Sequence, residues 1–258
     1  MRAAAAAAVL CLVLAPAAAG TSTTRPPIAF TASPSHLMLA GSNRATIHVT
    51  NFGARRVVID VRRAGFALDV HGRPRIVLRG DRRAAVSWLT LRPRTLALGP
   101  GQTAAVTVSS TLPARVEPGD HDALVLLVTR PRQRAGVALR MQMGVVVVVR
   151  APGRLVRRLE LHSLRVRRRT GGRLALELLV RNRGNVTEVL DRARVDASLV
   201  RRGALAAKLQ SEPCEVRPGT SGLLRLTYRG PLRGAVTVRV RVTVSRGRAV
   251  ARVFRLRL

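Results

Sequence analysis

The sequence is poor in lysine, in acidic residues and in aromatic side chains. Lys208 is the only lysine among 46 Lys and Arg residues, which face 13 Asp and Glu and give a formal net charge of +33. Aromatic residues make up 2% of the 258 residues. Basic surfaces that bind nucleic acids commonly carry stacking aromatics, and here the arginines are spread through both halves of the chain. We therefore expect no nucleic acid partner.

Cysteine is also scarce. The two cysteines, Cys11 and Cys214, cannot make a disulfide scaffold of a chain this long. Hydrophobic residues make up 47% of the chain, which is enough to build a core and excludes a disordered basic tail. The length allows one large domain or two of ordinary size.

Residues 1–19 have the layout of a secretory signal peptide. A basic residue precedes an alanine-rich apolar run, and Ala17 and Ala19 form a small-residue cleavage site. Cleavage there removes Cys11 and leaves residues 20–27 as a flexible lead-in, whereas an uncleaved anchor is the alternative. Since no second run has bilayer length, we expect an extracytoplasmic protein, secreted or associated with the cell surface, without a transmembrane segment after cleavage.

Apolar and polar residues alternate along most of the remaining chain. Near its end, for example, Val238 and Val240 alternate with Arg239 and Arg241. Successive side chains of a strand point to opposite faces, so a period of two predicts half-buried antiparallel strands. Turn signals that contain Pro-Gly separate these runs. The sequence therefore predicts an all-β protein whose arginines lie on outward strand faces.

The two halves of the chain share a weak repeat. VTNFG at residues 49–53 and LGPGQTAAVTV at residues 98–108 correspond to VRNRGN at residues 180–185 and VRPGTSGLLRL at residues 216–226. Asn and Gly suit these turns because both tolerate a left-handed backbone. With a boundary at residues 151–153, we expect two tandem immunoglobulin-like β-sandwiches at residues 28–150 and 154–258.

The first predicted sandwich carries a family resemblance. Its landmarks are PSHLML at residues 34–39, VTNFG, SWLTL at residues 87–91, LGPGQTAAVTV, PGDHDA at residues 118–123 and the valine run that follows. On these residues it resembles the N-terminal domain of pilus chaperones and is similar to that of WxL-interacting cell-surface proteins. Both resemblances imply a second β-sandwich. Pilus chaperones anchor a subunit carboxylate with two basic residues, and neither residues 28–32 nor residues 144–149 contain one.

No arrangement for catalysis or cofactor binding is present in the sequence. It contains no G-x-S-x-G elbow, no H-E-x-x-H motif and no phosphate-binding P-loop. Glu117, Asp120, His121 and Asp122 form a cluster, which we interpret as a solvated hairpin turn because it offers too few ligands for a closed metal site. We therefore predict a protein that is not an enzyme and has no cofactor or metal.

Two kinds of candidate binding residue remain. An exposed strand edge can pair with an extended segment of another protein, and outward arginines can attract an anionic polymer. The candidate edge is the run Gly144, Val145, Val146, Val147, Val148 and Val149. The candidate anion-binding residues are Arg165, Arg167, Arg168, Arg169, Arg239, Arg241, Arg255 and Arg257.

Together these features favour an exported, non-enzymatic module that binds or assembles cell-envelope components through sandwich edges and arginine-rich faces. We expect its partner to be an anionic cell-envelope polymer or another surface protein. The alternative function is that of a periplasmic-type chaperone for secreted surface or pilus subunits.

Overall fold

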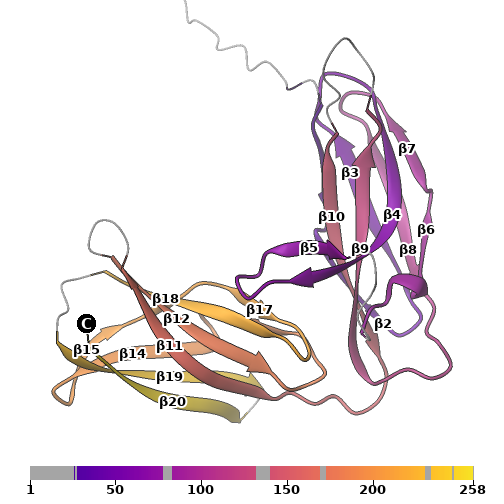
Figure 1. Cartoon of the computed structure of the whole chain (residues 1–258). Coiled ribbons are helices and arrows are strands. Elements are labelled where there is room, and N and C mark those ends of the chain that lie inside the picture. Colours follow the sequence, from indigo (N-terminus) through magenta and orange to yellow (C-terminus); the bar gives the residue numbers. More distant parts are fainter. Residues whose placement is uncertain are drawn as a thin grey trace, which may run out of the picture.

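A computed structural model of the chain describes its architecture (Figure 1). The described residues are 26, 28–77, 83–131, 140–168, 173–229, 234–245 and 247–257. The predicted signal peptide, nearly all of the lead-in and Arg169 lie outside them. Apart from one short 3-10 turn at Val86–Trp88, the regular structure within these ranges is β-strand, which confirms the predicted all-β fold.

Ten strands form the first sandwich. They are β1 (Phe30–Ser33), β2 (His36–Ala40), β3 (Arg44–Asn51), β4 (Val57–Leu68), β5 (Pro74–Val77), β6 (Leu89–Arg92), β7 (Thr95–Leu98), β8 (Thr103–Ser110), β9 (Gly119–Thr129) and β10 (Gln142–Ala151). One sheet has the order β1-β3-β8-β6. The other has the order β2-β10-β9-β4-β5, with β7 also paired to β4.

Ten further strands form the second sandwich. They are β11 (Leu159–Arg168), β12 (Arg173–Asn182), β13 (Glu188–Leu190), β14 (Val195–Arg201), β15 (Ala204–Lys208), β16 (Gln210–Ser211), β17 (Cys214–Val216), β18 (Ser221–Arg229), β19 (Ala235–Ser245) and β20 (Arg248–Arg257). Its sheets have the orders β11-β12-β18-β16 and β15-β14-β19-β20, and β13 pairs with β17. The predicted boundary at residues 151–153 falls at the end of β10.

Each sandwich has its own core of aliphatic side chains. In the first, Ile47 on β3 packs with Ile59 on β4 and Leu127 on β9. In the second, the valines of β19 are buried while Arg239 and Arg241 between them are exposed. The alternation seen in the sequence therefore becomes an apolar inner face and a charged outer face, as expected for strands with one buried side.

The repeated motif builds the same corner in both sandwiches. Asn51 is fully buried, and its Nδ2 donates to Arg55 O, Leu98 O and Gly99 O at 2.8, 3.1 and 3.0 Å. Its Oδ1 accepts the Gly53 N–H at 2.9 Å. One side chain thus ties the Asn-x-Gly turn to the Pro-Gly turn.

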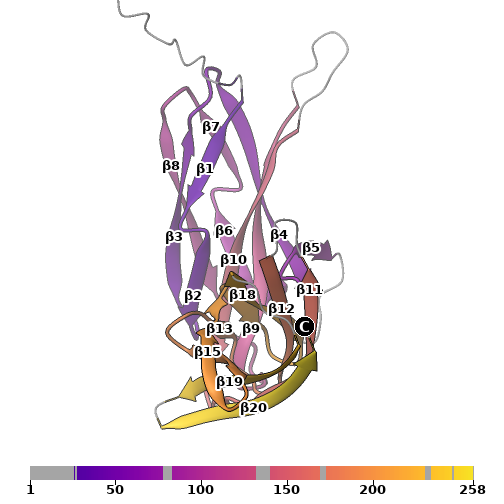
Figure 2. The ribbon, with the colours of Figure 1, turned by 90° about the vertical axis from the view of Figure 1, so that its left-hand side faces the viewer.

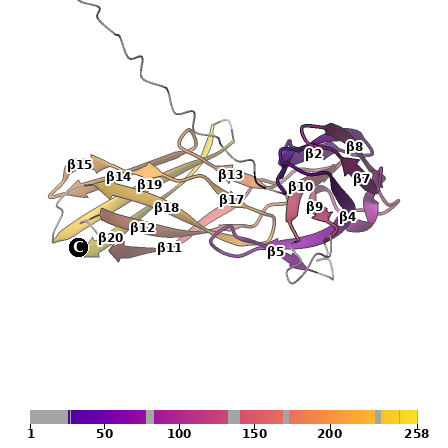
Figure 3. The same ribbon diagram turned by 90° about the horizontal axis from the view of Figure 1, so that it is seen from above.

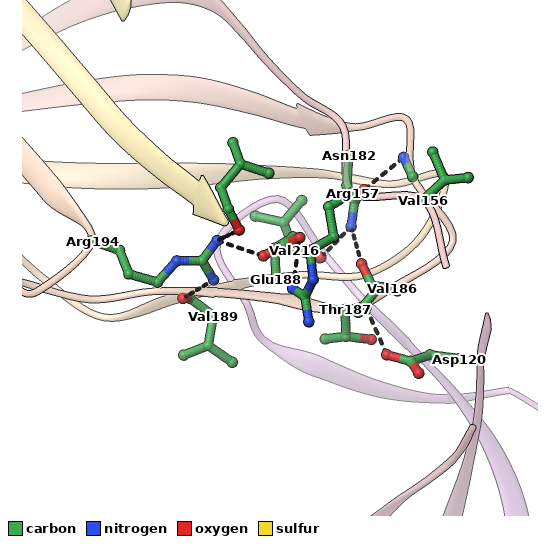
Figure 4. Close-up of polar contacts among 12 residues, drawn as sticks. Asp120, Val156, Arg157, Asn182, Val186, Thr187, Glu188, Val189, Arg194 and Val216 are labelled. Carbon is green, nitrogen blue, oxygen red and sulfur yellow. Dashed lines mark hydrogen bonds and ion pairs between the residues drawn. The ribbon is translucent and has the colours of Figure 1, made fainter. Parts of the chain in front are cut away.

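Asn182 repeats this pattern in the second sandwich. Its Nδ2 donates to Val186 O and Val216 O at 2.8 and 2.9 Å, and its Oδ1 accepts the Gly184 N–H at 2.8 Å (Figure 4). Buried amides need such partners, because an unpaired polar group in a core costs about 1–3 kcal/mol.

The expected left-handed glycines occur in only one of the two turns. Gly101 and Gly219 of the Pro-Gly turns have φ values of +74° and +73°, as a type II turn requires at its third position. Asn51, Asn182 and the glycines that follow them do not have positive φ, so the reason given for the Asn-x-Gly turns is wrong. Those turns use Asn for its side-chain hydrogen bonds, and Gly because neighbouring backbone lies against its Cα.

Two smaller features complete the fold. No helix within the described ranges has the length and hydropathy needed to cross a bilayer. Cys214 is half-buried, and burial raises the pKa of its thiol to about 11, which keeps it protonated at neutral pH.

Candidate functional site

The valine strand β10 has two different halves. Over residues 146–150 it pairs with β2 in parallel and with β9 in antiparallel orientation. Over residues 142–145 it pairs with β9 alone among the described strands. The predicted edge is therefore not open along its whole length. Val146, Val147, Val148 and Val149 lie inside the sheet because β2 occupies their free side, and only Gly144 and Val145 of the predicted run lie beside the unpaired stretch.

Backbone direction shows which groups face this unpaired stretch. The Val146 N–H donates to Ser35 O at 3.0 Å, and Arg150 O accepts the Gly41 N–H at 2.9 Å, so residues with even numbers face the β2 side. By the period of two, the N–H and C=O groups of Gln142 and Gly144 face the same side beyond the end of β2. An edge of this kind can pair with another chain.

The side chains beside this edge are apolar on one face. Met141 and Met143 are half-buried and pack against the end of the first core, while Gln142 and Gly144 are exposed on the other face. Methionine adapts its shape to irregular neighbours. An added strand would thus extend the core with its own apolar side chains.

Three of the four residues of the acidic cluster are buried at the start of β9, so its interpretation as a solvated turn is wrong for them, while Glu117 is exposed. Asp120, His121 and Asp122 are 0%, 2% and 3% exposed. They lie where the first sandwich meets the second, and in Figures 1 and 3 the two sandwiches meet end to end at an angle beside β5. Within the described residues we find no group of three or more His, Cys, Asp or Glu side chains placed to hold a metal ion.

Asp120 joins β10 to the second sandwich. Its two carboxylate oxygens accept hydrogen bonds from Arg150 Nε at 2.7 Å and Arg150 Nη2 at 3.0 Å. The Thr187 N–H also donates to Asp120 Oδ2, at 2.7 Å (Figure 4). Arg150, the basic residue at the end of β10, is therefore already occupied by an internal partner.

Asp122 pairs with Arg217 across the same junction. Both side chains are buried, and the guanidinium lies 4.3 Å from the Phe66 ring centroid and donates from Nη1 to Phe66 O at 3.1 Å. Burial raises the pKa of Asp122 to about 6, because desolvation outweighs the attraction of Arg217. Arg217 thus offsets part of the cost of burying the Asp122 carboxylate.

Backbone contacts make the junction tight. The Asp120 N–H donates to Asn185 O at 2.8 Å, and the Leu223 N–H donates to Val70 O in the β4–β5 turn at 2.7 Å. At Gly119, whose φ is +109°, an added Cβ would lie 2.1 Å from Asn185 O. The second sandwich therefore docks on the first through main chain as well as through ion pairs.

A buried carboxylate on β13 lies next to the Thr187 contact of this junction. Glu188 is fully buried and accepts hydrogen bonds from Arg157 Nη1 at 3.0 Å and Arg194 Nη2 at 2.6 Å (Figure 4). Arg194 also donates to Val189 O and Val244 O. Arginine suits such a site because its planar donors reach several acceptors at once.

The candidate anion-binding arginines divide between two sheets. Arg165 and Arg167 are exposed on β11, and for Arg168 the structure describes only the backbone. Arg239 and Arg241 on β19, together with Arg255 and Arg257 on β20, lie on the opposite side of the sandwich. The sequence did not indicate the Asp122–Arg217 pair, because 95 positions separate its partners.

The chain has the fold of fimbrial chaperones. No family model and no curated protein matches it. A structure of a chaperone–tip adhesin complex of CFA/I fimbriae matches with TM-score 0.50 and 12% identity, over 87% of this chain and 98% of that chain. The YadV chaperone gives 0.49 and 10% over 88% and 99%, and the E. coli chaperone DraB gives 0.45 and 12% over 90% and 98%. At these identities the similarity establishes the fold alone, and the expected likeness to WxL-interacting proteins stays a prediction.

Proposed function

We propose that this protein is an exported chaperone or assembly module that binds an extended segment of a surface protein along the unpaired half of β10. The observation that carries the proposal is the pairing of β10. Residues 146–150 are held between β2 and β9, while residues 142–145 have one neighbour in the described sheet. A strand fixed at one end and open at the other is a ready template for β-strand addition.

The geometry also defines the class of segment that would bind. The backbone groups of Gln142 and Gly144 would hydrogen-bond to the added strand, and Met141 and Met143 would contact its apolar side chains. The ligand is thus an extended stretch in which apolar residues alternate with polar ones. Since Arg150 is bound to Asp120, capture would depend on backbone pairing and apolar contact rather than on a charged anchor.

Similarity of fold supports a chaperone rather than a general binding module. A solved structure that shares this fold is that of a fimbrial chaperone in complex with a tip adhesin. The predicted signal peptide at residues 1–19 would place the protein outside the cytoplasm. The sequence shows no catalytic motif, which agrees with a non-enzymatic role.

Site-specific crosslinking tests where the partner binds. A photoreactive residue in place of Gln142 is expected to capture one exported protein in the native host, through an extended segment identified by mass spectrometry. The control position is His48, which is exposed on the interior strand β3 between β1 and β8. Capture of the same proteins from both positions would contradict the proposal.

A proline substitution tests how the partner binds. Gln142→Pro removes an N–H that faces the open side and leaves the hydrogen bonds to β9 in place. The loss of one hydrogen bond is expected to weaken the complex about tenfold. Gln142→Thr keeps the N–H and is the matched control, so equal complex yields from the two variants would exclude backbone pairing.

A further inference from the structure

The two outward faces of the second sandwich carry different charge patterns. On the face of the β15-β14-β19-β20 sheet, five basic side chains are exposed and none forms an ion pair with another described residue. They are Lys208, Arg239, Arg241, Arg255 and Arg257. Asp196, opposite Arg241, is the one acidic residue among the described side chains of this face. We call this the basic face.

On the opposite sheet, β11-β12-β18-β16, several arginines pair with acidic side chains. Glu177 lies between Arg167 and Arg225, at 3.5 and 3.6 Å. Glu160 lies 3.1 Å from Arg183, whose guanidinium holds the pKa of Glu160 below its usual range. The basic face therefore differs from the opposite face in presenting its cations without acidic partners among the described residues.

The strand register spreads the cations of the basic face. Arg239 lies opposite Val253 and Arg255 lies opposite Thr237, so no two arginines face each other directly across β19 and β20. Neighbouring cations sit on diagonals, which are about 7–8 Å apart in an antiparallel sheet. This arrangement limits repulsion within the sheet and presents separate charges to a surface.

Exposed aliphatic side chains lie among these charges. Val253 is 58% exposed in the row of Arg239, and Leu205 on β15 is 62% exposed in the row of Val200 and Thr237. A soluble polyanion has no apolar surface against which these side chains could be buried. The boundary between lipid headgroups and acyl chains can bury them. The combination of cations and aliphatic tips fits a membrane surface.

We propose that the basic face binds a membrane surface rich in anionic lipid headgroups. In Figures 1 and 2, β19 and β20 form the layer of the second sandwich that lies away from the first sandwich. The basic face is therefore separate from the unpaired half of β10, and one molecule can hold a partner strand and lie on a membrane at the same time. Each arginine near an anionic surface adds to binding, which weakens with salt.

Vesicle binding by the full chain tests this proposal. The probes are phosphatidylcholine vesicles with and without one quarter phosphatidylglycerol, at low and at physiological salt. The wild type is expected to bind only the anionic vesicles, and less at higher salt. A variant with Arg239, Arg241, Arg255 and Arg257 all changed to Gln is expected to lose on the order of a hundredfold or more in partitioning.

The matched control removes the same charge from the opposite face. Arg165, Arg167, Arg183 and Arg225 are changed to Gln, with circular dichroism confirming that both variants fold. This control is expected to change partitioning by less than about threefold, since its side chains are not at the membrane. Equal losses from the two variants would overturn the proposal, because net charge alone would explain them.

The aliphatic side chains distinguish a membrane from a soluble polymer. The double change Leu205→Thr and Val253→Thr is expected to lower vesicle partitioning roughly tenfold while leaving binding to dextran sulfate unchanged. Equal vesicle binding by this variant and the wild type, or tighter binding of the wild type to the polymer than to the vesicles, would overturn the lipid assignment.

Discussion

The Asn51 and Asn182 corners share three internal hydrogen bonds and have different surroundings. In both, the buried amide links an Asn-x-Gly turn to a Pro-Gly turn. The residue before the Pro-Gly pair is Gly99 in the first sandwich and Arg217 in the second. Only the second corner reaches the junction, where Arg217 contacts Asp122 and Phe66. The shared motif thus ties two turns together in each sandwich. In the second sandwich, Arg217 in place of glycine also joins the two sandwiches.

Of the variants considered, removal of Arg217 should lower the free energy of unfolding the most. Arg217→Met leaves the Asp122 carboxylate buried without its partner, and we expect it to lower the free energy of unfolding by about 3–5 kcal/mol. Urea denaturation measures the change. Arg225→Met, on the solvent-facing side of β18, is the control and should cost less than about 1 kcal/mol. Equal unfolding midpoints for the two variants would show that the junction does not depend on this pair.

Asp122 should also make the junction respond to pH. The pKa of Asp122 is about 6 in the folded protein and 3.8 when the carboxyl is free in solvent, as in the unfolded chain, so the folded protein binds the proton more tightly. Stability from this group therefore rises as the pH falls from about 6 to about 4, by up to about 3 kcal/mol. Comparison of the wild type with Asp122→Asn isolates this contribution. A wild type that loses stability relative to the variant over this range contradicts the sign.

The two corner asparagines should contribute equally. Asn51→Ala and Asn182→Ala each leave several buried carbonyl and N–H groups without partners, which should cost about 2 kcal/mol in each sandwich. Urea unfolding followed in each sandwich separately, by amide exchange, measures both. A loss of stability at only one corner would contradict this prediction. The two corners would then share their hydrogen bonds but not their contribution to stability.

The glycines of the two corners should differ modestly. A Cβ on Gly184 would lie 2.2 Å from Val156 O, whereas a Cβ on Gly53 would lie 2.8 Å from Ala29 N. Both changes to Ala overpack the backbone, at about 1–3 kcal/mol, and Gly184→Ala should be the more costly. Thermal unfolding of the two variants provides the test, and the reverse order would contradict it.

Local patterns in the sequence predicted the fold well. Alternation along β19 and the repeated turn motifs depend on neighbouring residues, so they reveal strands and corners directly. The arrangement of β2 beside β10 could not be predicted this way, because the parallel register of His36 with Val146 depends on the assembled sheet. The acidic cluster was misread for the same reason, since residues of the second sandwich bury Asp120 and Asp122.

Amide hydrogen exchange along β10 tests the central claim most directly. In the free protein, the amides of Gln142 and Gly144 should exchange rapidly, while those of Met143 and Val145, which face β9, should be protected. In the complex of the unmodified protein with the partner identified by crosslinking, the Gln142 and Gly144 amides should become protected as well. Protection of these two amides in the free protein, or rapid exchange that persists in the complex, would contradict strand addition at this edge.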